Sequence, residues 1–158
     1  MGRDRSLIRK LMVAVTDEYD LETFCETGTG YGDTAVWADQ YFSNVITIEL
    51  DHELHERVRS QYQDRTNIQF VRGASQEALE THGEKFDSAT LFWLDAHHSG
   101  GETAGSDNVC PLLEELEVIE GLGITPFIFI DDARLFLCPP LDQPQSEDWP
   151  FIDEVIAE

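Results

Sequence analysis

The chain has 158 residues, and hydrophobic residues make up 41% of it, so its composition suits one folded domain with a real core. Its 32 acidic and 10 basic residues give a net charge of −22, which repels phosphate backbones and excludes nucleic acid as a favoured partner. No run of about 18 apolar residues occurs, so no membrane partner is expected. The acid excess also suggests a halophile's salt-rich cytoplasm, where screening removes the self-repulsion.

The cysteines indicate a reducing compartment. There are three of them, Cys25, Cys110 and Cys138, without tight spacing, which argues against a disulfide framework and favours a cytoplasmic location. Only Cys110, just before a predicted helix, stands where the pKa of a thiol could be lowered.

Helical and strand patterns alternate along the chain. A helix is predicted for residues 5–16, where apolar residues recur at helical spacing. Strands are predicted at 21–25, 45–50, 67–71, 89–94 and 126–130, and the helices between them begin at Asp33, Asp51, Ser75 and Pro111. Asp33 and Asp51 are expected to cap their helices. A last short helix is expected at 151–156.

This alternation predicts a single α/β domain over residues 1–158. Parallel strands joined by right-handed crossovers give a three-layer, Rossmann-like fold with a mainly parallel sheet of about five strands. The strands are nearly all apolar, as expected when helices cover both faces of the sheet. Acidic residues follow several strands, at the edge where such sheets bind ligands.

The segment after the first strand carries Gly28, Gly30 and Gly32. Glycines at such a strand–helix junction let backbone approach a ligand closely. A dinucleotide fingerprint needs its third glycine at position 33, but Asp33 stands there, and its carboxylate would repel a pyrophosphate. A glycine-rich turn without a ligand is the alternative.

The glycine segment, preceded by Glu26 and followed by Glu49 at the end of the second strand, resembles motif I of class I S-adenosylmethionine-dependent methyltransferases. The resemblance covers about residues 21–133. It implies that Glu26, Gly28, Gly30 and Gly32 face the methionine part of the cofactor, that Glu49 holds the ribose and that Ser75 lies near the adenine. Residues 92–104 and 110–116 are also similar to uncharacterised bacterial methyltransferase-like proteins.

A second resemblance concerns the last two strands. Asp95, Asp131 and Asp132 follow them in a pattern similar to the metal-dependent O-methyltransferases related to macrocin O-methyltransferase. The similarity implies that the three carboxylates hold Mg²⁺, which would orient and acidify a substrate hydroxyl. His97 and His98, after Asp95, are candidates for a general base. The alternative is that Asp131 and Asp132 only end a strand.

The expected function is therefore O-methylation of a small hydroxylated substrate. A non-catalytic S-adenosylmethionine-binding or interaction module is the alternative, and an NAD-dependent oxidoreductase is disfavoured by Asp33. The methyltransferase fold usually continues with a C-terminal β-hairpin, which the short, proline-containing segment after Asp132 cannot hold. The open sheet edge could then be covered by a homodimer partner.

Overall fold

The computed structural model describes residues 6–96, 110–137 and 149–157. The strands are β1 (Thr23–Thr27), β2 (Asn44–Glu49), β3 (Ile68–Arg72), β4 (Thr90–Leu94) and β5 (Phe127–Ile130). The helices are α1 (Ser6–Tyr19), α2 (Asp33–Ala38), α3 (His52–Gln61), α4 (Ser75–Thr81), the 3₁₀ turn η1 (Gly83–Lys85), α5 (Leu112–Gly121), α6 (Arg134–Leu137) and α7 (Ile152–Ala157).

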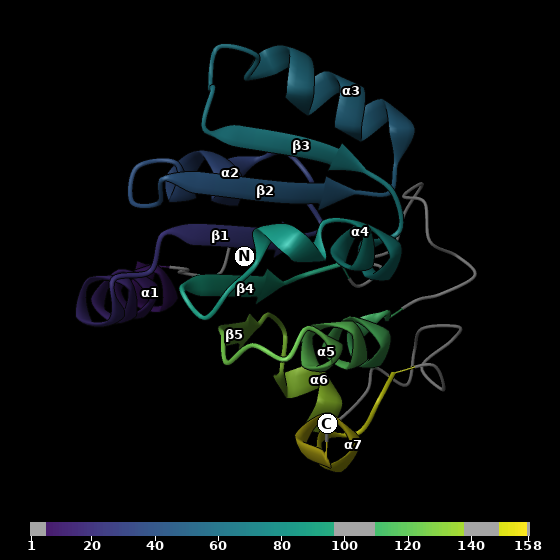
Figure 1. The fold of residues 1–158 in the computed structure, drawn as a ribbon. Coiled ribbons are helices and arrows are strands. Elements are labelled where there is room, and N and C mark those ends of the chain that lie inside the picture. Colours follow the sequence, from purple (N-terminus) through teal and green to yellow (C-terminus); the bar gives the residue numbers. More distant parts are fainter. Residues whose placement is uncertain (1–5, 97–109, 138–148, 158) are drawn as a thin grey trace.

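The five strands form one parallel sheet with the order β3-β2-β1-β4-β5 (Figure 1). The chain runs outward from β1 to β3, then crosses back to β4 and continues to β5. The order therefore reverses between β1 and β4, which is where open α/β sheets bind ligands. The prediction of a Rossmann-like α/β fold with five parallel strands is confirmed.

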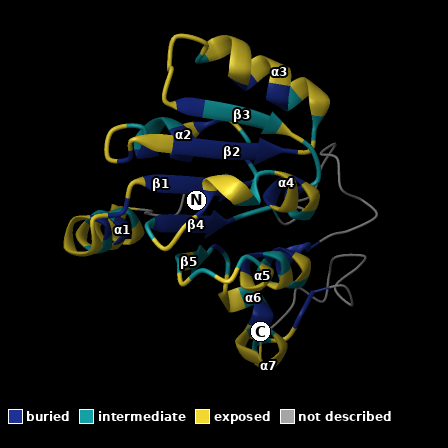
Figure 2. Cartoon of the chain, viewed as in Figure 1, coloured by how far each residue is buried: buried dark blue, intermediate teal, exposed yellow. Residues whose placement is uncertain are grey.

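Successive strand side chains point to opposite faces of the sheet and build two separate cores. One face packs Phe24, Val45 and Leu91 against α1 and α2. The other packs Cys25, Ile46 and Phe92 against α4, α5 and α6. Figure 2 shows the consequence: the inner strands β1, β2 and β4 are almost wholly buried, whereas β3 and β5 at the edges are less so.

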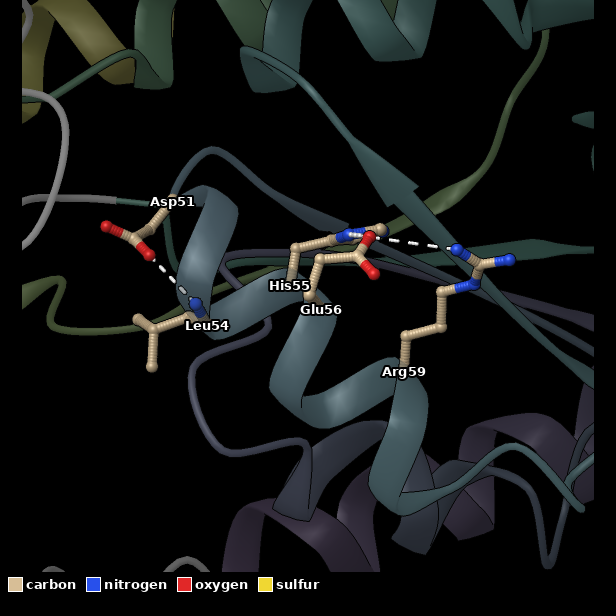
Figure 3. Close-up of polar contacts among 5 residues, drawn as sticks. All are labelled: Asp51, Leu54, His55, Glu56 and Arg59. Atoms are coloured by element: carbon tan, nitrogen blue, oxygen red, sulfur yellow. Dashed lines mark hydrogen bonds and ion pairs between the residues drawn. The ribbon is translucent and has the colours of Figure 1, made fainter.

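The two predicted caps have different outcomes. Asp51 caps α3 as expected, because its Oδ1 accepts the Leu54 N–H at 2.8 Å (Figure 3). The expected cap at Asp33 is wrong: Gly32 is the N-cap of α2, with φ 81°, and Asp33 is the first helical residue. A glycine can take this left-handed conformation without the steric penalty of a Cβ.

Two further features differ from expectation. The apolar stripe predicted for the first helix is largely uncovered: Leu7 is 74% exposed and Leu11 53%, while Met12 is buried. The short helix α6 was not predicted. In the described residues beyond Ile130 no strand occurs; residues 138–148 lie outside them, so the lack of a C-terminal hairpin stays a prediction. Among the described helices, none has the length and apolar character needed to span a bilayer.

Candidate functional site

The glycine segment leaves β1 beside the end of β2. The N–H groups of Gly28 and Thr29 both donate to the Ile48 carbonyl, at 3.0 and 3.1 Å, so the segment remains hydrogen-bonded to β2 after β1 has ended. The Gly32 N–H then donates to the Thr29 carbonyl at 2.9 Å and closes the turn into α2. The segment is thus held by its backbone on both sides.

Each of the three glycines is required for its own reason. All have positive φ, at 82°, 53° and 81° for Gly28, Gly30 and Gly32. A Cβ on Gly28 would lie 2.4 Å from the Asp95 carbonyl oxygen, and one on Gly32 would lie 2.7 Å from a methyl of Val58. At Gly30 no heavy atom comes within 4 Å of that position. A ligand can therefore approach the backbone at Gly30, whereas Gly28 and Gly32 serve close packing.

Glu49 joins this segment to the start of α3. Its Oε2 accepts the Gly30 N–H and its Oε1 accepts the Asp51 N–H, both at 2.9 Å. The side chain is nearly buried, so these contacts hold the carboxylate in one orientation. A carboxylate oxygen has more than one acceptor site, so Glu49 retains capacity for the hydroxyls of a ligand.

Glu26 belongs to the same network. It is 2% exposed, and its Oε2 accepts the Thr47 hydroxyl at 2.8 Å. The Thr47 hydroxyl also lies 2.6 Å from that of Thr29 in the glycine segment. The structure thus brings together Glu26, Glu49 and the three glycines, as the sequence predicted.

This donor and acceptor set fits S-adenosylmethionine. Its sulfonium and ammonium groups are cationic, so the carboxylates of Glu26 and Glu49 favour them, and the space beside Gly30 admits a ligand. Asp33, exposed in the first turn of α2, puts a negative charge where a dinucleotide would bring its pyrophosphate.

Ser75 lies at the start of α4, which follows β3. It is buried at the first position of this helix, and its hydroxyl donates to Gln76 Oε1 at 3.5 Å. The hydroxyl is thus engaged inside the protein. A contact between Ser75 and an adenine ring stays a prediction.

Binding of Mg²⁺ by Asp95, Asp131 and Asp132 stays a prediction. Among the described side chains, no group of three or more His, Cys, Asp or Glu residues could hold a metal ion. Local contacts explain this: Asp131 Oδ1 accepts the Asp132 N–H at 2.8 Å, and Asp132, in a left-handed conformation with φ 55°, lies 3.7 Å from Arg134. The carboxylates of Asp131 and Asp132 organise the turn after β5 instead.

Asp95 is positioned by the end of β1. Its N–H donates to the Thr27 carbonyl and lies 3.2 Å from the Thr27 hydroxyl, which places Asp95 at the reversal point of the strand order. His97 and His98 lie outside the described residues, so their roles stay predictions.

The two cysteines within the described residues are not activated. Cys25 and Cys110 are free and buried. Burial, followed by the nearby carboxylates Glu115 and Glu26, raises the pKa of Cys25 well above its usual value. Burial also raises the pKa of Cys110 to about 11, although the backbone N–H of Leu112 acts to lower it. The expected lowering at Cys110 is wrong because desolvation outweighs the helix terminus.

Sequence reasoning missed Glu115. It is 1% exposed, and burial raises its pKa to about 7, against hydrogen bonding from Ser75 and Thr27 that lowers it. A signal was present: Glu115 falls on the same helical face as Leu112 and Ile119, which are buried. An acid within an apolar stripe indicates a buried polar contact.

Comparison with known proteins identifies a family that covers the glycine segment. The family described as "Methyltransferase domain" matches residues 24–110, more than half of the chain. The sequence finds no match among curated proteins.

Three solved structures share the fold. They are the O-methyltransferase TomG from Streptomyces achromogenes in complex with S-adenosylmethionine (15% identity, TM-score 0.62, 94% of this chain and 64% of that one), the S-adenosylhomocysteine-bound methyltransferase PaMTH1 of Podospora anserina (15%, 0.62, 94% and 64%) and a proposed O-methyltransferase from Klebsiella pneumoniae (14%, 0.65, 99% and 68%).

At these identities the solved structures establish the fold, and this chain spans roughly two thirds of the length of each of the three. The family is established by the match over residues 24–110, which begins inside β1 and includes the glycine segment, Glu49 and Asp95. The chain belongs to the methyltransferase domain family.

Proposed function

We propose that this chain methylates an oxygen atom of a small hydroxylated substrate. The observation that carries the cofactor part is the contact between Glu49 and the Gly30 N–H, which presents a carboxylate beside open space in the glycine segment. The oxygen acceptor is supported by the O-methyltransferases among the proteins of similar fold.

The chain's own residues would divide the binding task. Glu49 would accept the ribose hydroxyls, and the glycine segment with Glu26 would surround the methionine part, where two carboxylates favour the cationic groups. When bound, S-adenosylmethionine supplies the methyl group from its sulfonium. Asp95 follows β4 at the reversal point of the sheet, so the acceptor hydroxyl is proposed to lie there.

Calorimetric titration tests the cofactor assignment against its two competitors. We expect S-adenosylhomocysteine and S-adenosylmethionine to bind and NAD not to bind, because of Asp33. Binding of NAD alone would refute the proposal in favour of an oxidoreductase. Binding of both sulfur compounds without methyl transfer to a panel of sugars and phenols would favour the non-catalytic module.

The acceptor side is tested by substitution. His97 and His98 follow Asp95 in the sequence and are proposed general bases. We expect Asp95→Asn and one of His97→Gln or His98→Gln to lower the rate of methyl transfer while S-adenosylhomocysteine affinity stays constant. If all three variants transfer the methyl group at the wild-type rate, these residues are removed from the proposal. No metal step is included, because the described carboxylates form no metal-binding group.

We also propose that the chain is one domain and that it works in a salt-rich, reducing cytoplasm. The net charge of −22 repels itself at low ionic strength, and the Debye length falls from about 10 Å at 0.1 M salt to about 3 Å at 1 M. The free energy of unfolding should therefore rise with KCl. A flat profile in chemical denaturation would contradict the salt adaptation.

A homodimer is proposed at the β5 edge. Ile128 on this edge strand is 38% exposed, and Leu137 on α6 is 69% exposed. Sedimentation equilibrium measures the oligomeric state. We expect the wild type to be a dimer and Ile128→Lys to be a monomer. A monomeric wild type would refute the dimer.

A further inference from the structure

A cavity of about 430 Å³ lies at the amino ends of β1, β2 and β3. This volume falls within the range of small-molecule sites, which is about 300–1,000 Å³. Figure 1 shows these strand starts on the side opposite the arrowheads, whereas the glycine segment follows the carboxyl end of β1. A strand of five residues spans roughly 16 Å, so the cavity is separate from the candidate cofactor site.

The chain's own hydrogen bonds hold the walls of this cavity in place. The Val45 N–H donates to the Asn67 carbonyl at 2.9 Å and joins the start of β2 to the loop before β3. Lys85 Nζ donates to Gln69 Oε1 at 2.6 Å and joins η1 to β3. The walls therefore need no ligand to hold them.

The rim of the cavity is polar, and its side chains are available to a ligand. Four rim residues are exposed, and in the described part of the chain their side chains form no hydrogen bond: Ser43, Asn44, Thr66 and Asn67. Gln69 offers its amide nitrogen, because η1 already occupies its oxygen. The inner wall is apolar and includes the buried residues Val45, Ile46 and Ile68.

The charge of the cavity differs from that of the chain as a whole. Acids make up 32 of the 158 residues, but none of them lines the cavity. Lys85, one of only two lysines in the sequence, is the single charged residue of the lining. One ammonium group and several amide and hydroxyl donors thus surround a space without carboxylates, an arrangement that favours an anion.

We propose that this cavity binds a small hydroxylated carboxylate, such as a sugar acid. The carboxylate of the ligand accepts from Lys85 Nζ and from the neighbouring Gln69 amide. Its hydroxyl groups bond to the amides of Asn44 and Asn67, and its carbon chain covers the apolar inner wall. A phosphate ester fits less well, because its second negative charge finds no second cation among the lining residues.

This site is independent of the proposed methyl transfer, because the two sites lie at opposite edges of the sheet. Failure of one assignment leaves the other standing.

Nuclear magnetic resonance of the isotope-labelled chain, titrated in KCl, locates binding residue by residue. Gluconate is the probe, and sorbitol, which has an alcohol in place of the carboxylate, is its uncharged match. We expect gluconate to shift the backbone amide signals of Asn44, Asn67 and Gln69 saturably and to leave those of Gly28 and Gly30 unmoved. Sorbitol should bind at the same place about tenfold more weakly, the loss typical of one charged hydrogen bond.

Substitution of the lysine tests the source of this preference. Lys85→Gln keeps a donor toward Gln69 but removes the charge, so it should lower gluconate affinity about tenfold and leave sorbitol affinity unchanged. The matched control is Lys10→Gln, which removes the same charge from an exposed position of α1 and should bind gluconate as the wild type does.

Three results overturn the inference: no saturable shift at the cavity, equal affinities of the wild type for gluconate and sorbitol, or an unchanged gluconate affinity of Lys85→Gln. Tighter binding of inorganic phosphate than of gluconate at the same signals overturns the carboxylate assignment. If Lys85→Gln does not fold, the comparison of gluconate with sorbitol in the wild type still decides.

Discussion

The acids at the carboxyl ends of β1 and β2 behave differently from those that follow β5 in the same sheet. Glu26 and Glu49 are held by residues distant in sequence, through the Thr47 hydroxyl and the Gly30 N–H. Asp131 and Asp132 interact with their own turn, through the Asp132 N–H and Arg134. Acids at strand ends become a site only where contacts between strands orient them.

The largest expected effect on stability is at Gly28, where the end of β1 meets the end of β4. Gly28→Ala would place a Cβ 2.4 Å from the Asp95 carbonyl oxygen at positive φ, so we expect it to lower the free energy of unfolding by roughly 2–5 kcal/mol. Gly30→Ala meets no atom within 4 Å and should lose only about 1–2 kcal/mol from backbone strain. Urea denaturation compares them; equal losses would show that the approach of β4 does not restrict Gly28.

The buried acid between the two edges should make stability depend on pH. The pKa of Glu115 is raised from 4.5 to about 7, so its ionisation opposes folding: its favourable contribution is complete below about pH 4.5 and is lost as pH rises through 7. Glu115→Gln should remove a loss on the order of 3 kcal/mol across this range. Unfolding measured from pH 4.5 to 8 checks this against Glu117→Gln, and parallel curves for the two variants would contradict it.

At the carboxyl ends of β1 and β2, the charge of Glu49 should matter for the affinity of the cofactor. Glu49→Gln keeps the size of the side chain but loses the carboxylate that accepts the Gly30 and Asp51 N–H groups. We expect S-adenosylhomocysteine affinity to fall by roughly 10- to 100-fold, in line with about 1.5–3 kcal/mol for a charged hydrogen bond. Affinity within twofold of the wild type, measured by calorimetry, would mean that the carboxylate is not a cofactor ligand.

At the β5 end the same change should have little effect. Asp132→Asn retains a residue that tolerates φ 55°, and it weakens a contact with Arg134, whose side chain is 60% exposed. The free energy of unfolding should change by less than about 0.5 kcal/mol. A loss of unfolding free energy in urea denaturation as large as that of Gly28→Ala would show that this acid, too, is required for the fold.

The same contrast explains what the sequence could predict. Strand and helix positions followed from periodicity, because apolar runs such as 90–94 are buried on both faces. The glycine segment was predictable because each of its glycines adopts a positive φ, which favours glycine at that position. Glu115 was not found, and the arrangement of Asp95, Asp131 and Asp132 could not be foreseen, because both depend on which side chains meet across elements. The exposure of Leu7 and Leu11 has the same origin: helical spacing defines a stripe but not what covers it.

The bridge from Glu49 to Gly30 and Asp51 has one more consequence. Because the chain's own groups make this bridge, the conformational entropy of the glycine segment would be lost during folding and not during association. The cofactor would then meet a rigid receptor, so its association rate should not depend on a slow loop-ordering step. Glu49 would then both bind the ribose and hold the glycine segment in the conformation that admits the cofactor.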